Sequence, residues 1–102
     1  HRVLLIDDHA VVREGFARLL DEADGFEVVA QAGTPAEAVA AARRHAPDLA
    51  LVDLSLGNEN SGLVLLAQLQ EAVEGLHCVM LSMHDDPALV VRALERGARG
   101  YF

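Results

Sequence analysis

The sequence has no lysine and a single cysteine, and none of its apolar runs approaches the length of a membrane span. Eight arginines stand against sixteen acidic residues, which gives a formal net charge of −8. An acidic surface repels the phosphate backbone, so this composition argues against direct binding of nucleic acid by the segment itself. We interpret the lone Cys78 as a buried, inert thiol, with a reactive thiol as the alternative, and we expect a reduced, cytoplasmic setting.

Other absences narrow the class of protein further. The sequence shows no signal-peptide pattern, internal repeat, low-complexity tract or linker, so we expect one domain over residues 1–102. It also has no Gly-x-Gly-x-x-Gly turn after the first apolar run and no Walker-type loop. This argues against a nucleotide- or phosphate-using hydrolase. The chain starts at His1 without a methionine and stops in an apolar stretch, so we expect both ends to be cut.

Short apolar runs alternate with helical patterns along the whole chain. Hydrophobic residues make up 52% of it, which argues against disorder. Strict alternation of strand and helix is typical of βαβ units and a parallel sheet with helices on both faces. We predict strands at residues 2–6, 26–32, 49–53, 77–82 and 100–102, and helices at 11–22, 35–45, 61–72 and 87–96.

Two of the predicted helices carry clear boundary signals. Thr34, Pro35 and Glu37 supply an N-cap, a proline in the first turn and a capping-box acid for the second helix. Asp86 precedes Pro87 at the start of the fourth helix, and we interpret Gly97 as the residue just past its end.

Polar and acidic residues terminate three of the predicted strands. Asp7 and Asp8 follow the first strand, Asp53 ends the third and Ser82 ends the fourth. In a parallel sheet these ends lie at one edge, where ligands bind. Three carboxylates there would repel one another unless a cation joined them. The pattern therefore predicts metal-assisted phosphate chemistry.

Four segments in this order and spacing resemble a response-regulator receiver domain: residues 5–9, 51–56, 81–87 and 93–102. Residues 11–15 and the Asp-Asp-His and Met-His-Asp-Asp-Pro runs are similar to the NarL/FixJ branch. The resemblance implies an α/β, flavodoxin-like, doubly wound parallel sheet with strand order 2-1-3-4-5. It also implies transcription regulation through a C-terminal helix-turn-helix DNA-binding domain that is not in this chain.

The resemblance also implies a role for each candidate site residue. Asp53 is the expected phosphoacceptor, and Ser82 is expected to bond a phosphoryl oxygen after transfer while Tyr101 changes rotamer with it. Mg²⁺ is expected to contact Asp8, Asp53 and the backbone carbonyl of Ser55, with Asp7 acting mostly through water. The positions expected to tune the lifetime of the phosphoryl group are Ser55, Met83 and His84.

Each of these roles has a plainer alternative. Asp53 could cap a strand end, and the Asp7–Asp8 pair could form a solvated acidic turn. Ser82 and Tyr101 could be an ordinary strand-end serine and a half-buried edge tyrosine. His84 could instead be a base or a metal ligand, and His9 either positions the acidic pair or lies in solvent.

Three departures from the family pattern stand out. The family lysine that pairs with the phosphoryl group is expected two residues beyond Phe102, and a fifth helix is missing too. We therefore expect the sheet face shared with the first helix to be partly uncovered and to expose apolar surface. In the loop after Asp53, Gly57 stands where the family usually has proline, and Gly62 comes one residue late.

The favoured function is thus Mg²⁺-dependent phosphotransfer from a sensor histidine kinase to Asp53, which switches dimerisation or an output domain. Such a domain phosphorylates and dephosphorylates itself but is not a conventional turnover enzyme. The alternative is a degenerate receiver that acts as a phosphorylation-independent interaction module. The expected partners are the kinase and a second copy of the chain, with DNA only through the output domain and no membrane.

Overall fold

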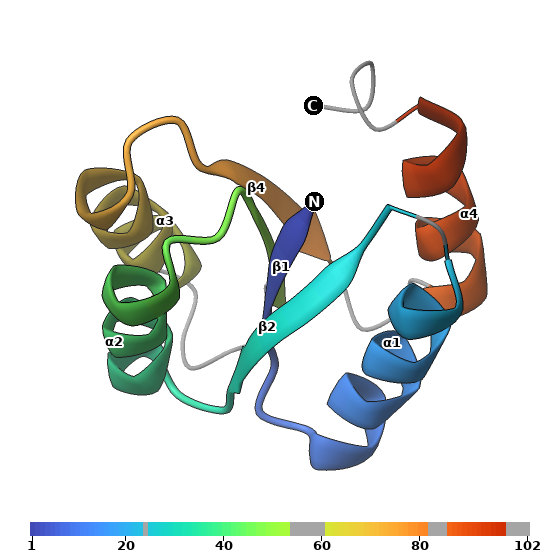
Figure 1. Ribbon diagram of the computed structural model, residues 1–102. Helices are drawn as coiled ribbons and strands as arrows, with labels where there is room; N and C mark the ends of the chain where they lie inside the picture. The colour runs from blue at the N-terminus through green and yellow to red at the C-terminus, as the bar shows by residue number, and fades with distance from the viewer. Residues whose placement is uncertain (24, 54–60, 82–85, 98–102) are drawn as a thin grey trace.

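The computed structural model describes residues 1–23, 25–53, 61–81 and 86–97, which form alternating strands and helices (Figure 1). The elements in chain order are β1 (Arg2–Ile6), α1 (Ala10–Glu22), β2 (Glu27–Ala32), α2 (Pro35–His45), β3 (Leu49–Asp53), α3 (Ser61–Ala72), β4 (His77–Leu81) and α4 (Pro87–Gly97).

The described strands form one parallel sheet in the order β2-β1-β3-β4. This confirms the predicted order as far as the fourth strand, while the predicted fifth strand lies outside the described residues. The register pairs Ile6 of β1 with Val52 of β3, and Asp53 with Leu81 of β4. The carboxyl ends of β1, β3 and β4 therefore meet at one edge.

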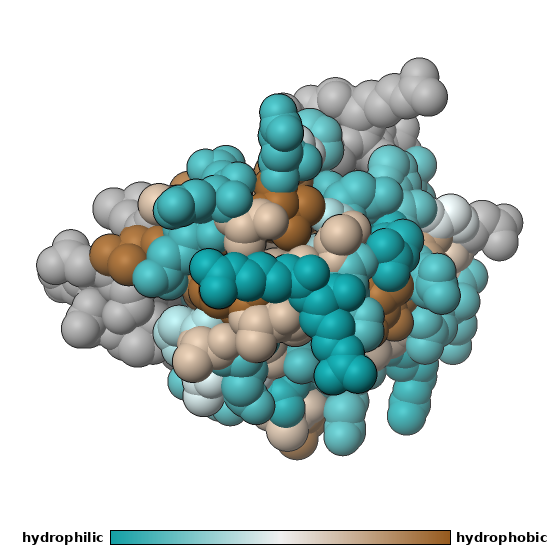
Figure 2. All heavy atoms as spheres, turned by 60° about the vertical axis from the view of Figure 1, so that its left-hand side comes forward, coloured by the Kyte–Doolittle hydropathy of each residue, from teal (hydrophilic) through white to brown (hydrophobic). Residues whose placement is uncertain are grey.

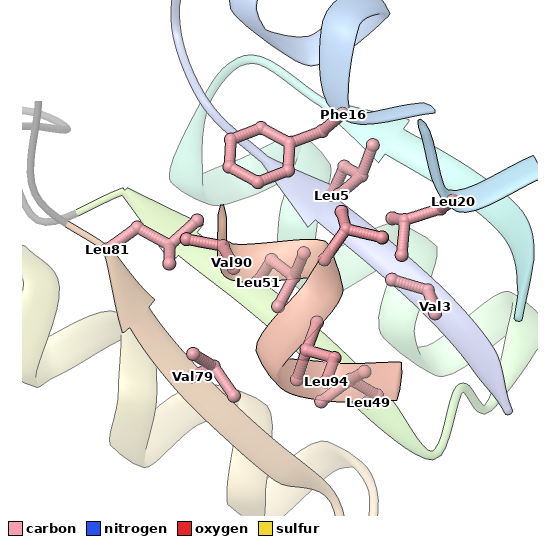
Figure 3. Packing of buried hydrophobic residues seen from close by; sticks show 11 residues of the cluster. Val3, Leu5, Phe16, Leu20, Leu49, Leu51, Val79, Leu81, Val90 and Leu94 are labelled. Atoms are coloured by element: carbon pink, nitrogen blue, oxygen red, sulfur yellow. The ribbon is translucent and has the colours of Figure 1, made fainter. Parts of the chain in front are cut away.

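Side chains alternate across the sheet and supply a separate core on each face. One core joins Val3, Leu5, Leu49, Leu51, Val79 and Leu81 to buried residues of α1 and α4 (Figure 3). The other joins the intervening residues of the same strands to α2 and α3, and includes Leu4, Ile6, Ala50 and Val52. Because β1 and β3 are covered on both faces, they are apolar nearly throughout, as their sequences predicted.

The helix boundary signals are confirmed with small changes. Thr34 Oγ1 accepts a hydrogen bond from the Glu37 N–H at 3.2 Å, as expected of an N-cap. The Glu37 carboxylate accepts from the N–H of Gly33, one residue earlier than in the usual capping box. Asp86 caps α4 by accepting from the Ala88 N–H at 2.9 Å. Gly97 is the last residue of α4 and not the first residue beyond it.

Two further predictions are corrected at single residues. Phe26 was placed in the second strand, but β2 begins at Glu27 and the Phe26 ring stacks on His1 with centroids 5.4 Å apart. Cys78 is half-buried in β4, so its burial is less complete than predicted. Burial still raises the pKa of its thiol to about 11, which agrees with an inert thiol.

The position of α4 corrects a larger expectation. We expected the sheet face of α1 to be partly uncovered, but α4 lies on that face beside α1 (Figure 1). Val90, Val91 and Leu94 of α4 are buried there against the strands. A hollow of about 270 Å³ remains between the two helices, lined in part by Leu19 and Arg92. Apolar residues of α4 thus cover the sheet face beside α1 in the part of the chain that the structure describes.

The opposite layer presents α2 and α3 to solvent. Its outer surface is mainly hydrophilic and is broken by small apolar patches (Figure 2). Arg43 and Arg44 of α2 are exposed, and so is Val64 of α3. Within the described part of the chain, no helix combines the length and the apolar character needed to cross a membrane.

Candidate metal centre

The acidic residues singled out from the sequence meet at the carboxyl edge of the sheet. Asp7 and Asp8 follow β1 directly, and Asp53 is the last residue of β3. The Asp7 N–H donates to the carbonyl of Ala32 at 3.0 Å, which extends the β1–β2 ladder to the start of the loop. Because β1 and β3 are hydrogen-bonded neighbours, their terminal carboxylates are brought together by the register of the sheet.

Asp7, Asp8, His9 and Asp53 form one cluster. One ligand atom from each residue lies within 4.8 Å of the corresponding atoms of the others. Burial differs within the cluster, because Asp53 is only 5% exposed while Asp8 is exposed. Asp53 therefore forms a buried floor of the cluster, and Asp8 forms a side that is open to solvent.

His9 closes one side of the cluster. Its ring Nδ1 lies 2.7 Å from Asp8 Oδ1 and 3.2 Å from Asp7 Oδ1. Its backbone N–H also donates to Asp7 Oδ1 at 2.8 Å. Of the two interpretations left open for His9, these contacts favour the one in which it positions the acidic pair.

The surroundings of Asp7 oppose the ionisation of its carboxyl group. Burial is the largest influence on Asp7 and raises the pKa of its carboxyl above the ordinary 3.8, and the nearby charge of Asp53 raises it further. The hydrogen bonds from His9 lower the pKa and only partly compensate. A cation would favour the ionised form of all three carboxylates, since it replaces mutual repulsion with attraction.

The donor set fits Mg²⁺ chemically. Magnesium prefers oxygen ligands, uses one or two carboxylates together with phosphate oxygens, and keeps several waters. Asp7, Asp8 and Asp53 supply carboxylate oxygens, and the open side at Asp8 leaves room for water. The described residues can therefore hold a divalent cation of this kind.

Five predicted site residues lie outside the described residues, so their roles stay predictions: Ser55, Ser82, Met83, His84 and Tyr101. Sequence reasoning did not single out two residues that border the cluster. Arg13 donates from Nη1 to the backbone carbonyl of Asp7, and Gly33 lies against the same guanidinium group. The signal for Arg13 was present, because Arg13, Phe16 and Leu20 share the i, i+3, i+7 spacing of a buried helix face.

This parallel sheet, with an acidic cluster at the carboxyl ends of its first and third strands, is what a receiver domain has. The family model described as "Response regulator receiver domain" matches residues 3–102. The chain belongs to the response regulator receiver domain family.

Among curated proteins, the chain is 46% identical over 99 residues to the transcriptional regulatory protein UhpA of Escherichia coli (strain K12). This match covers 97% of the chain and 48% of UhpA. It is 36% identical over 100 residues to the oxygen regulatory protein NreC of Staphylococcus haemolyticus, covering 98% of the chain and 46% of NreC. The chain thus spans about half the length of these relatives.

Solved structures agree with this assignment. A two-component response regulator of the LuxR family from Aurantimonas sp. matches with a TM-score of 0.73 and 32% identity, over 94% of this chain and 68% of that one. The signal receiver domain of the putative response regulator NarL from Mycobacterium tuberculosis matches with a TM-score of 0.69 and 32% identity, over 93% and 76%. Together these relatives support the NarL/FixJ-like branch.

Proposed function

We propose that this chain is the phosphoacceptor domain of a cytoplasmic two-component response regulator, with Asp53 as the residue that receives the phosphoryl group. The observation that carries the proposal is the meeting of a buried Asp53 with Asp7 and Asp8 at one edge of a parallel sheet. Family membership implies a histidine kinase as the donor protein.

The transfer is a simple displacement at phosphorus. A carboxylate oxygen of Asp53 forms a P–O bond while the P–N bond of a phosphohistidine breaks, and the imidazole nitrogen leaves with the electron pair of that bond. The product is an acyl phosphate on Asp53, which water can later hydrolyse. Catalysis of such transfers consists mainly of positioning and charge stabilisation.

The described residues supply the positioning. The end of β3 fixes the backbone of Asp53, and its burial limits the directions from which a donor can approach. Asp7, Asp8 and Asp53 would hold Mg²⁺, with the Ser55 carbonyl as a further ligand. When bound, Mg²⁺ would offset the negative charge gathered between the carboxylates and the phosphoryl oxygens. Ser82 and Tyr101 remain the proposed switch pair, and Ser55, Met83 and His84 the proposed tuning positions.

The names and lengths of the relatives indicate what phosphorylation would regulate. UhpA is named a transcriptional regulatory protein, and the matched region is only about half of it. We therefore propose that phosphorylation of Asp53 changes self-association or the activity of a DNA-binding output domain outside this chain. The acidic charge of the segment, −8, supports a signalling role for it and not direct contact with DNA.

Intact-protein mass spectrometry tests the proposal. The full natural chain incubated with acetyl phosphate and Mg²⁺, or with its phosphorylated kinase, should gain one phosphoryl group. The adduct should be absent with EDTA and in Asp53→Asn, which keeps the shape of the side chain but removes the nucleophilic carboxylate. Asp21→Asn, an exposed acid on α1, is the matched control and should behave as wild type.

Two results would contradict the proposal. An adduct that persists in Asp53→Asn would place the phosphoacceptor elsewhere. A folded protein that accepts no phosphoryl group from either donor would instead support the phosphorylation-independent interaction module.

A further inference from the structure

Arg13 is a charged residue on the buried side of α1. It shares this helix face with Phe16 and Leu20, which are 5% and 0% exposed. Arg13 itself is half-buried and lines a small cavity beneath the site together with Asp7, Phe16 and apolar strand residues. An apolar side chain of similar length would suit this position better if burial were the only demand, since charged groups are costly to bury.

The guanidinium group of Arg13 joins α1 to the loop that carries the acidic pair. Its Nη1 donates to the backbone carbonyl of Asp7 at 2.5 Å. The carboxylate of Asp7 accepts instead from the N–H of His9, and one of its oxygens lies in the acidic cluster. The Nε of Arg13 is also buried and has no hydrogen-bond partner among the residues that the structure describes.

Gly33, just after β2, makes room for this contact. A Cβ atom built on Gly33 would lie 2.8 Å from Arg13 Nη1 and 3.7 Å from its Cζ. Gly33 is not among the described glycines with positive φ, which are Gly25 and Gly75, so its backbone conformation does not itself require glycine. A side chain at position 33 would therefore displace the end of the Arg13 side chain from its present place.

Gly33 is in turn held by the start of α2. Its N–H donates to Glu37 Oε1 at 3.2 Å, and the same carboxylate accepts from the hydroxyl of Thr34. The guanidinium group of Arg13 thus lies between the loop after β1 and the turn after β2. The loop after β1 carries Asp7, Asp8 and His9 of the acidic cluster.

We propose that Arg13 is a positioning residue for the phosphoacceptor site. Its guanidinium group holds the β1–α1 loop so that Asp7 and Asp8 face Asp53. Because Gly33 has no side chain, the guanidinium group has room to contact the backbone carbonyl of Asp7. The phosphorylation readout of this inference rests on the proposed function, whereas its metal-binding readout does not.

Substitutions at both residues test the inference in the full chain. Because the sequence has no tryptophan, binding is best followed by calorimetry with Mg²⁺ and by electron paramagnetic resonance of free Mn²⁺. Arg13→Met keeps the length but loses the charge and the donor, and should weaken metal affinity about 10-fold or more, as loss of a supporting hydrogen bond does at other metal sites. Arg13→Lys keeps the charge and should recover part of the affinity. The rate of phosphorylation by acetyl phosphate should be highest in the wild type, lower in Arg13→Lys and lowest in Arg13→Met.

Gly33→Ala provides the sharper probe. Its methyl group would displace the flexible end of Arg13 and should weaken metal binding in the wild-type background. In the Arg13→Met background the same substitution should add little, because the group that it displaces is gone. Gly15→Ala is the matched control, since nothing lies within 4 Å of a Cβ at Gly15, and it should leave metal affinity unchanged.

The thermal midpoint of each variant separates positioning from simple stabilisation. A purely structural Arg13 would lower the midpoint of Arg13→Met without changing the metal affinity of the folded protein, and that result would overturn the inference. Wild-type affinity in a folded Gly33→Ala would also overturn it, even if Arg13→Met did not fold. If the wild-type chain binds metal but accepts no phosphoryl group, the proposed function fails while the metal-binding test of Arg13 remains decisive.

Discussion

At Asp7 two physical demands oppose each other. The residue must ionise to hold a cation, yet burial and the charge of Asp53 raise its pKa. In the metal-free protein the folded state therefore binds a proton at pH values where the unfolded chain has already lost it. Stability must then fall as pH rises from 3.8 through the raised pKa of the folded state.

Asp7→Asn should reduce this pH dependence. Without metal, the wild type should lose stability relative to Asp7→Asn as pH rises through that window, because the variant has no carboxyl to ionise. Added Mg²⁺ should stabilise the wild type more than the variant, since binding to the folded state alone raises the free energy of unfolding. Urea unfolding at several pH values, with and without Mg²⁺, measures both effects, and parallel curves for the two proteins would contradict the prediction.

At Cys78 burial raises the pKa of the thiol, because it disfavours the charged thiolate. With a pKa of about 11, only about 0.1% of the thiol is ionised at pH 8, compared with roughly a quarter for a free thiol. Alkylation by iodoacetamide at pH 8 should therefore be about 100-fold slower or more in the folded protein than in urea. A folded-state rate close to the unfolded one would show that the thiol is reactive.

At the level of elements, α2 ends in an unusual residue. Ala46 adopts φ 45°, ψ 59°, a left-handed conformation that is costly for a residue with a Cβ. It follows the basic last turn of α2 and precedes the buried Pro47, so the chain must reverse here to enter β3. Glycine commonly fills this position because it has no Cβ.

Ala46→Gly should stabilise the protein. Relief of the backbone cost should outweigh the extra entropy of glycine in the unfolded chain by about 0.5–1 kcal/mol. Ala40→Gly, at an exposed position in the same helix, should instead destabilise by about 1 kcal/mol. Chemical denaturation of both variants provides the comparison, and a loss of stability in Ala46→Gly would mean that the left-handed conformation is not populated in solution.

At the scale of the whole molecule, the main feature that local sequence does not specify is the face of the sheet on which α4 packs. β3 and β4 are joined by α3 on the α2 face, which is the right-handed connection. A further parallel strand at the outer edge of β4 would, by the same rule, place α4 on that face too. In the structure α4 instead contributes Val90, Val91 and Leu94 to the core on the α1 face.

Leu94→Ala tests this placement. Leu94 of α4 is fully buried against α1 and the sheet. Its truncation should therefore cost about 2–5 kcal/mol of folding free energy. Leu89→Ala, 60% exposed on the same helix, should change stability by less than about 0.5 kcal/mol. Similar effects at the two positions would show that α4 does not pack through this face.

Much of the site was predictable because its residues occupy strand ends. An apolar run followed by an acid indicates a strand end in a βαβ pattern, and parallel strands bring such ends to one edge. Asp7, Asp8 and Asp53 were found in this way, and the cluster that they form is confirmed. The contact of Arg13 with Gly33 was not found, because Arg13 lies in α1 and Gly33 follows β2, and no local pattern pairs residues of two different elements.

The sequence by itself determined the alternating elements, their boundary signals and the chemistry at the carboxyl edge, since hydrophobic period, capping and proline act over a few residues. Only the tertiary structure decided which face α4 covers, how deeply Asp53 is buried and that Gly33 lies against Arg13. These features depend on contacts between segments far apart in the chain. Local patterns cannot specify such contacts, because the same apolar stripe can be buried equally well on either face of a sheet.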